Sequence, residues 1–317
     1  MNRRAFLTTA GGVCAGVAFA QQPAQVAAAA ALVKRRIKLG ISTYSYWGEE
    51  KKPTVEAIIQ RAGDLGVECV DILHRNLDMD ELKPMDAAGR AYCRRLKRLA
   101  FGKGIAVACL STHQNFVSPD EKRRQHQVEH TLRCLDVADA LGAGCVRVNA
   151  GRWGTVKKFE EYMEKRGLEP AIEGRTDDDA FGWSIESLGK CLKRAEELGI
   201  PLALENHWGL TRSPEGVMRI LDALKSPFVG ALMDTGNFLE DPYDKLKTIA
   251  PATIFVQAKT YPGGGRWYSV DLDYARIAGI LADVGYGGYV SLEMEGKEPP
   301  DKAVPKSIEM LRRAFGV

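Results

Sequence analysis

The sequence lacks a strong excess of either charge. Its 317 residues include 44 Lys and Arg against 41 Asp and Glu, so the formal net charge is only +3. A balance this even gives no electrostatic argument for a nucleic-acid partner, because phosphates attract proteins with a clear basic excess. With 45% hydrophobic and 27% charged residues, the composition also excludes a disordered, collagen-like or coiled-coil chain.

Several other signals are missing. No apolar run after the first 33 residues is long enough to cross a bilayer. The seven cysteines form no Cys-x-x-Cys motif, and Cys69, Cys109 and Cys145 lie in apolar, strand-like runs. This placement favours buried free thiols over a disulfide framework. A Gly-x-Gly-x-x-Gly motif is also absent after the first predicted strand, which disfavours a dinucleotide-binding sheet.

The first 20 residues have the pattern of an export signal. Arg3 and Arg4 precede an uncharged stretch that ends in Ala18-Phe19-Ala20, a small-x-small cleavage pattern. Because the arginine pair resembles a twin-arginine signal, we predict an exported, periplasmic protein whose mature chain starts near Gln21. A frayed amphipathic tail or an anchor helix is the alternative.

Helical stretches of the chain repeatedly end in glycine and are followed by a short apolar run. Such a glycine suits the left-handed position that ends a helix, and short β-branched runs are typical of buried parallel strands. Eight strands are predicted, over residues 37–43, 67–73, 105–110, 144–149, 200–205, 228–234, 252–258 and 288–293. Eight alternating units indicate a single-domain α/β fold, the (β/α)8 TIM barrel, with an open doubly wound sheet as the alternative.

The chain is therefore expected to have three parts: a signal peptide over 1–20, a linker over 21–36 and a barrel catalytic domain over 37–317. Within the barrel, the stretch 152–182 is longer than a loop needs. It is predicted to hold a helix over Val156–Arg166 and a polar loop that covers the top face.

Three carboxylates directly end predicted strands. Glu205, Asp234 and Glu293 end strands five, six and eight, and Gln257 lies in strand seven. In a barrel the carboxyl ends of the strands meet at one rim, where the chemistry of this fold is found. Buried carboxylates repel one another unless a cation pairs with them. Four oxygen donors favour manganese or magnesium over zinc, so we predict a metal site, with structural ion pairs as the alternative.

Polar and aromatic side chains at the rim are candidates for sugar contact, since sugars are bound by planar polar groups and aromatic faces. The substrate-binding candidates are His113, Asn115, Arg147, Asn149, His207 and Lys259, with Trp47 and Trp153 as aromatic candidates whose usual role would be packing. His113 could instead be a structural, hydrogen-bonded histidine, and Arg147 could pair with Asp71 or Glu205. His126 and His130 lie four residues apart on a predicted helix and are interpreted as solvated surface rather than a zinc site.

Four short motifs carry a resemblance to a known family. They are Leu204-Glu205-Asn206-His207, Met233-Asp234-Thr235-Gly236-Asn237, Val256-Gln257-Ala258-Lys259 and Glu293-Met294-Glu295-Gly296. These motifs have the order and separations of the xylose-isomerase-like TIM-barrel family. Together with the repeating pattern over residues 37–316, they make the chain resemble that family. That family consists of sugar isomerases and epimerases and is related to endonuclease IV.

The resemblance implies one divalent metal ion, held by Glu, Asp, His and Glu on strands five to eight. On this sequence the ligands would be Glu205, Asp234, Gln257 and Glu293, with manganese as the expected ion and magnesium or cobalt as alternatives. Gln257 departs from the usual His: its carbonyl oxygen can bind a hard cation, but more weakly, and it cannot shuttle a proton. Glu295, two residues beyond Glu293, would be a competing ligand or a partner of the ligands.

The resemblance also implies proton removal next to a carbonyl, with Glu205 and Glu293 as the acid–base pair. We therefore expect a metal-dependent isomerase or epimerase of a sugar or keto-sugar. The same enediolate can expel a leaving group, so a lyase, dehydratase or glycoside β-eliminase is the nearest alternative. A non-catalytic sugar-binding barrel with a degenerate metal site is a further one, and Gln257 is its best support.

The export signal narrows the expected partners. Phosphorylated sugars are mostly cytoplasmic, although Gly263-Gly264-Gly265 beside Arg266 keeps a phosphate open. We expect an unphosphorylated sugar or glycoside, no nucleic acid and no stable membrane insertion after signal removal, and a homo-oligomer stays open. An endonuclease role is disfavoured because that activity resembles a three-zinc site rich in histidine, whereas Asn237 and Gln257 stand where histidines would help.

Overall fold

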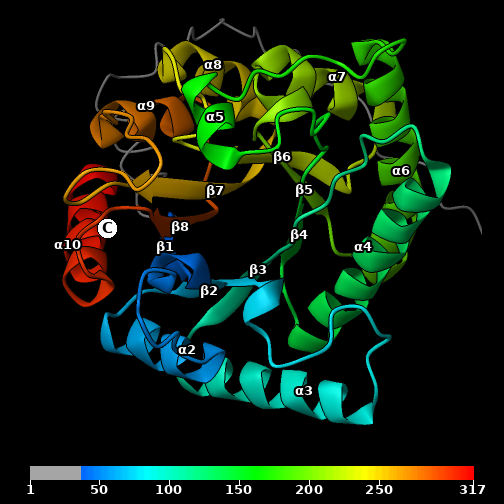
Figure 1. Ribbon diagram of the computed structural model, residues 1–317. Helices are drawn as coiled ribbons and strands as arrows, with labels where there is room; N and C mark the ends of the chain where they lie inside the picture. Colours follow the sequence, from blue (N-terminus) through cyan, green and yellow to red (C-terminus); the bar gives the residue numbers. More distant parts are fainter. Residues whose placement is uncertain (1–36) are drawn as a thin grey trace, which may run out of the picture.

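The computed structural model describes residues 37–317, so the predicted signal peptide and linker lie outside the described part of the chain. Over these residues eight parallel strands close into a barrel in sequence order, and β8 pairs with β1 (Figure 1). The strands are β1 Lys38–Ser42, β2 Cys69–Leu73, β3 Ala106–Ser111, β4 Cys145–Val148, β5 Leu202–Glu205, β6 Val229–Asp234, β7 Thr253–Thr260 and β8 Tyr289–Met294. The predicted TIM barrel is confirmed, and the open doubly wound sheet is excluded.

Helices follow the strands and surround the barrel (Figure 1). They are α2 Val55–Asp64, α3 Ala87–Gly102, α4 Glu121–Leu141, α5 Phe159–Glu164, α6 Asp177–Leu198, α7 Pro214–Leu224, α8 Pro242–Ile249, α9 Tyr274–Asp283 and α10 Pro300–Phe315. Short 3-10 turns add η1 Thr43–Tyr46, η2 His74–Asn76, η3 Gly209–Thr211 and η4 Ala250–Ala252. In residues 37–317 no helix is both long and apolar enough to span a bilayer.

The helix ends follow the capping chemistry of the sequence. Gly142 and Gly199 close α4 and α6 in the left-handed conformation, with φ of 70° and 68°. At the start of α7, the Ser213 hydroxyl accepts a hydrogen bond from the Gly216 N–H, ahead of Pro214 in the first helical turn. These capping residues therefore fix where α7 begins.

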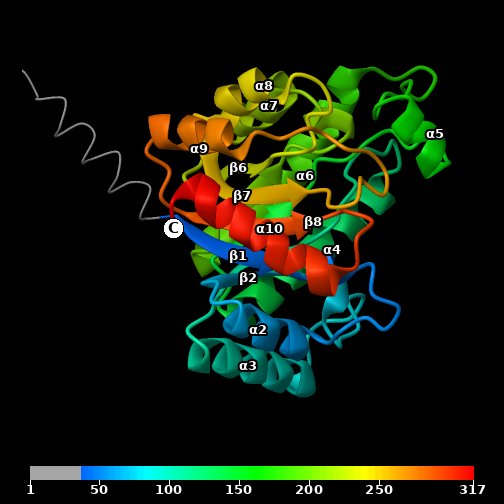
Figure 2. The same ribbon diagram turned by 90° about the vertical axis from the view of Figure 1, so that its left-hand side faces the viewer.

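The long segment between β4 and β5 differs in detail from the prediction. The helix expected over Val156–Arg166 is shorter, Phe159–Glu164. The next helix, α6, begins at Asp177, because Thr176 and Asp179 form a reciprocal capping box and three aspartates fill its first turn. In Figure 2, β7 and β8 point toward the side of the molecule on which α5 lies, so this segment stands at the C-terminal end of the barrel.

The barrel interior has an apolar layer below a polar one. The apolar layer is Cys69, Ala108, Cys109, Cys145, Ala203, Leu232 and Phe255. Two residues further along six of the strands stand Asp71, Ser111, Arg147, Glu205, Asp234 and Gln257. Because side chains two apart on a strand face the same way, these polar groups lie inside the barrel, nearer its C-terminal mouth. The six cysteines of the described residues are buried and free, as predicted.

Candidate functional site

The polar layer continues upward on β7 and just past β8. Lys259 lies two residues beyond Gln257, and Glu295 two residues beyond Glu293, so both also face the barrel interior. Each ionisable side chain of this group is 8% exposed or less: Asp71, Arg147, Glu205, Asp234, Lys259, Glu293 and Glu295. Water therefore screens these charges poorly, and their pairings determine how the site is arranged.

Glu205 is held by three neighbours. Its Oε2 accepts a hydrogen bond from Asn149 Nδ2 at 2.7 Å and lies 3.2 Å from Arg147 Nη1. Its Oε1 accepts from Asn237 Nδ2 at 3.0 Å. Arg147 thus pairs with Glu205, one of the two partners expected for it from the sequence. Both carboxylate oxygens of Glu205 are satisfied, which fixes their direction.

Lys259 forms the second ion-paired group. Its Nζ lies 2.7 Å from Glu293 Oε2, 2.8 Å from Glu295 Oε1 and 3.5 Å from Asp234 Oδ2. The strand register brings this about, since Lys259 on β7 is directly opposite Glu293 on β8. Gly236 leaves room for the lysine stem: a Cβ there would lie 2.8 Å from Lys259 Cδ. Glu295 is therefore a partner of the same cation as Glu293.

Two buried carboxylate or amide oxygens in this layer have no hydrogen-bond partner among the described residues: Asp234 Oδ2 and Gln257 Oε1. The other oxygen of Asp234 accepts from the Gly236 N–H at 2.8 Å. Gln257 donates its amide N–H to Asp71 Oδ2 at 2.7 Å, which turns its carbonyl oxygen away from that carboxylate. Asp234 and Gln257 are paired in the β6–β7 register, so both unpartnered oxygens come from adjoining strand ends.

The layer is short of positive charge. Five buried carboxylates face two buried cations, Arg147 and Lys259. Burial would lower the pKa of Lys259, but Asp234, Glu293 and Glu295 outweigh it and raise that pKa well above its usual value. Burial raises the pKa of Asp234 well above its usual range and that of Asp71 to about 6. Burial alone would raise the pKa of Glu293, but the positive charges of Lys259 and Arg147 have the larger effect and lower it.

These residues fit a hard divalent cation. The donors are carboxylate and amide oxygens, two of them accept no hydrogen bond, and the formal charge of the layer is negative. In this conformation, however, the carboxylates are divided between Arg147 and Lys259. Among residues 37–317, the one set of three His, Cys or acidic side chains with ligand atoms all within 4.8 Å is His74, Glu81 and His130, so the rim carboxylates are more widely spread.

The other predicted rim residues fall into two sets. Near the carboxylates, His113 lies 3.0 Å from Arg147 Nη2, and burial lowers the pKa of both His113 and His207, which keeps both rings neutral at pH 7. Asn149 binds Glu205 as described. Asn115 is exposed and accepts from the backbone N–H groups of Val117 and Arg152, so it organises a loop.

The two predicted tryptophans make packing and surface contacts. Trp47 is 45% exposed, stacks on Tyr44 and carries Lys52 over its ring. Trp153 is buried, donates to Asp177 and packs edge-on against Trp183, which is the packing role considered for it.

A different set of aromatic rings adjoins the carboxylates, and sequence reasoning missed it. Phe159 on α5 lies 5.2 Å from the Trp208 ring, and Trp208 lies 6.2 Å from Tyr268. Tyr268 Oη donates to Asn237 Oδ1 at 2.9 Å, and Asn237 in turn holds Glu205. The sequence offered one signal for these rings: Trp208 comes directly after His207, which was predicted to lie at the rim.

Residues 59–314 match the family described as xylose isomerase-like TIM barrel, and the chain belongs to that family. No curated protein matches it in sequence.

Among solved structures, D-psicose 3-epimerase in the presence of D-fructose is similar, with 17% identity, a TM-score of 0.68, and coverage of 88% of this chain and 100% of that one. The apo 3-keto-D-glucoside 4-epimerase from E. coli has 18% identity and a TM-score of 0.68, over 87% and 99% of the two chains. The IOLI protein with a binding zinc atom has 16% identity and a TM-score of 0.63, over 87% and 96%. At these identities the likeness establishes the fold, and several of these structural neighbours are sugar epimerases.

Proposed function

We propose that this protein is a divalent-metal-dependent epimerase or isomerase of an unphosphorylated sugar or keto-sugar. The observation that carries the proposal is the pair of buried carboxylates Glu205 and Glu293, each beside a buried cation at the mouth of the barrel. Removing a proton next to a carbonyl and returning it requires two acid–base groups and positive charge for the developing oxyanion. The epimerase titles of the structural neighbours support the same class of substrate.

The residues have distinct parts in this proposal. Glu293 is the proton acceptor, because the cations beside it lower its pKa and keep it ionised at neutral pH. Glu205, fixed by Asn149, Asn237 and Arg147, handles the proton at the other side of the substrate carbon. Arg147 and Lys259 stay protonated and stabilise negative charge on substrate oxygens.

A metal ion, with manganese as the expected one, would be held by Glu205, Asp234, Gln257 and Glu293. When bound, such an ion supplies the Lewis acidity that stabilises an enediolate. Two oxygens support this donor set: Gln257 Oε1, which accepts no hydrogen bond, and Asp234 Oδ2, whose neighbour is Lys259 Nζ at 3.5 Å.

The aromatic rings beside Asn237 support a sugar ligand. Tyr268 and Trp208 offer flat apolar faces next to the hydrogen-bonding groups of the mouth, the combination on which sugars are bound. The carboxylates are almost fully buried, so a sugar reaches them only when the side chains that cover them move aside.

The test is exchange of a substrate C–H proton in D₂O, with a panel of free sugars and 3-keto-glycosides and with manganese added. Wild-type protein should exchange one carbon-bound proton, and Glu205→Gln and Glu293→Gln should each abolish the exchange. Glu215→Gln, on the exposed face of α7, is the matched control and should exchange normally. No exchange with any sugar, in protein that carries its metal, would rule the proposal out.

A non-catalytic sugar-binding barrel is favoured by one observation: Lys259 already pairs with Glu293 and Glu295, the side chains that an ion or a substrate would need. Such a protein would bind a sugar, which would change the NMR signals of that sugar, but it would not exchange a C–H proton for deuterium. The same experiment therefore separates the two candidates.

A further inference from the structure

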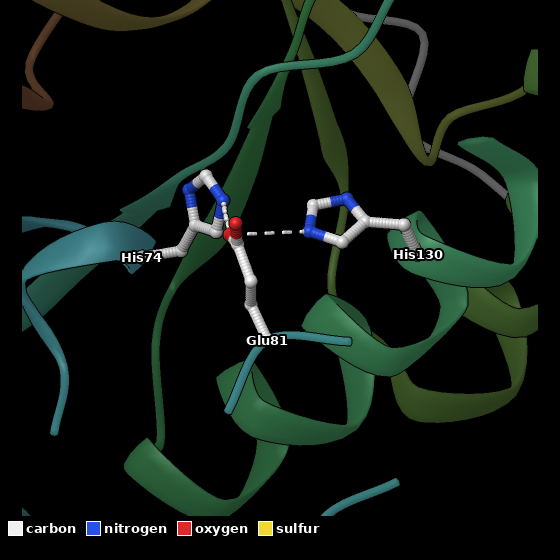
Figure 3. Close-up of side chains that lie close together, drawn as sticks. All are labelled: His74, Glu81 and His130. Carbon is white, nitrogen blue, oxygen red and sulfur yellow. Dashed lines mark ion pairs between the residues drawn. The ribbon is translucent and has the colours of Figure 1, made fainter. Parts of the chain in front are cut away.

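A second group of metal-ligand side chains lies at the end of β2 beside α4, and its His74 ring is 6.3 Å from the ring of His113. His74 follows β2 in η2, Glu81 lies in the loop before α3, and His130 is on α4. Their ligand atoms all lie within 4.8 Å of one another, and the two imidazole rings are 5.1 Å apart. Figure 3 shows the Glu81 carboxylate between the two rings. His130 is buried in this group, so its interpretation as solvated surface was wrong.

The hydrogen bond of His74 determines which nitrogen faces the group. Its Nδ1 lies 3.1 Å from the carbonyl oxygen of Ser111. A carbonyl can only accept, so Nδ1 carries the hydrogen and, in the neutral ring, Nε2 presents a lone pair. This Nε2 is in direct contact with Glu81 Oε2. Two acceptors that face each other are stable only when they share a cation, either a proton or a metal ion.

Both histidines are shielded from water. Only 5% of His74 and 6% of His130 is exposed. An imidazole binds a metal ion in its neutral form, so binding at this group would release the shared proton.

Glu81 connects the group to solvent. Its side chain is 36% exposed, which gives an ion a route to the buried nitrogens. Arg75 Nε lies 3.9 Å from Oε1, and His130 Nε2 lies 3.5 Å from Oε2. One carboxylate oxygen of Glu81 thus faces Arg75, and the other faces the two histidines.

We propose that His74, Glu81 and His130 form a zinc site that ties the loop before α3 to α4. Two imidazole nitrogens and one carboxylate oxygen suit zinc, which commonly takes three protein ligands and leaves a fourth position to water. They suit manganese or magnesium less well, because those ions prefer all-oxygen sites. Cys134 is also close to the group. It lies one helical turn beyond His130 on α4, and its Sγ is 3.8 Å from His130 Nε2.

The site has its own residues but adjoins the mouth, since the His74 ring lies 6.3 Å from the His113 ring. The cavity beside it is lined by Leu110, Cys134 and Val137, which belong to the layer between barrel and helix. The Ser111 backbone accepts from His74, while the Ser111 hydroxyl donates to Asp71 at 2.6 Å. An ion here would fix the three chain segments that carry its ligands. Through Ser111 it would also fix the position of Asp71 in the polar layer of the barrel.

The experiment is a titration of the chelator-stripped full chain with zinc and, as a spectroscopic probe, cobalt. The background is the Glu205→Gln/Asp234→Asn double variant, so an ion at the mouth does not contribute. This background should bind one zinc ion, show the visible absorption of cobalt with nitrogen ligands, and unfold at a higher temperature with zinc. Glu81→Gln, at a part-exposed position that tolerates the change, should weaken zinc binding by about tenfold or more.

His126→Gln is the matched control, an exposed histidine on the same helix, and it should leave zinc affinity unchanged. His130→Gln should remove the cobalt spectrum. Equal zinc affinity with and without Glu81→Gln, or no zinc binding in the background protein, would overturn the proposal. Neither result bears on proton exchange at the mouth, so the two proposals fail independently.

Discussion

At the scale of single residues, the chemistry of the mouth depends on how Gln257 is held. Its N–H group donates to Asp71, and its carbonyl oxygen has no partner among the described residues. An amide in this position offers one weak oxygen ligand. Asp71 would equally accept from the second nitrogen of an imidazole, the carboxylate–histidine arrangement that strengthens metal ligands.

We predict that Gln257→His tightens manganese binding by about tenfold or more, because imidazole is a stronger donor and Asp71 is in place to orient it. Gln257→Leu, which removes the oxygen, should weaken binding. Metal content and affinity of the three proteins are the measurement. Full and equal occupancy in all three would mean that residue 257 does not bind the ion.

A second prediction concerns the buried pair Arg147–Glu205, whose side chains are 4% and 1% exposed. Arg147→Met leaves an unpaired buried carboxylate and should lower the free energy of unfolding by about 3–5 kcal/mol. The double variant Arg147→Met/Glu205→Gln should recover part of this loss. Urea unfolding of metal-free protein measures both, and simple additivity of the two single changes would show that the pair is not coupled.

At the scale of elements, the loop after β5 carries His207 and Trp208 and turns sharply at Gly209. There φ is +78°, and a Cβ would lie 2.3 Å from the carbonyl oxygen of Gly151 in the loop after β4. These two loops can approach each other so closely because residue 209 has no side chain.

Gly209→Ala should therefore destabilise the protein by more than about 1 kcal/mol and weaken sugar binding, since it moves Trp208. Gly279→Ala is the matched control: it lies within α9, where a Cβ meets nothing within 4 Å. It should stabilise by about 0.5–1 kcal/mol. Thermal and urea unfolding give both values, and the same sign for both would contradict this account.

At the scale of the whole molecule, the barrel brings residues far apart in sequence into one layer. Gln257 on β7 bonds Asp71 on β2 across the interior, over 186 positions of sequence. The location of the protein in the cell depends on the segment before the barrel, for which export is our proposal.

Replacing Arg3 and Arg4 by lysine should trap the precursor inside the cell, because the arginine pair is the feature that marks the twin-arginine route. Arg35→Lys/Arg36→Lys, beyond the proposed cleavage site, is the matched control and should be exported normally. Fractionation and N-terminal sequencing of the mature chain, expected to start near Gln21, make the measurement. Normal export of the Arg3/Arg4 variant would contradict the twin-arginine assignment.

The order of strands and helices, the barrel they close and the strand ends that carry the proposed ligands could all be predicted from the sequence; those ligands are Glu205, Asp234, Gln257 and Glu293. These follow from local patterns: glycine at helix ends, short apolar runs, and a side-chain period of two. Tertiary structure alone decided the pairings, namely Arg147 with Glu205, Lys259 with Glu293 and Glu295, and Gln257 with Asp71. It also placed His130 beside His74 and Glu81. Such pairings depend on strand register, barrel closure and the space available to each side chain, and none of these is encoded within a few neighbouring residues.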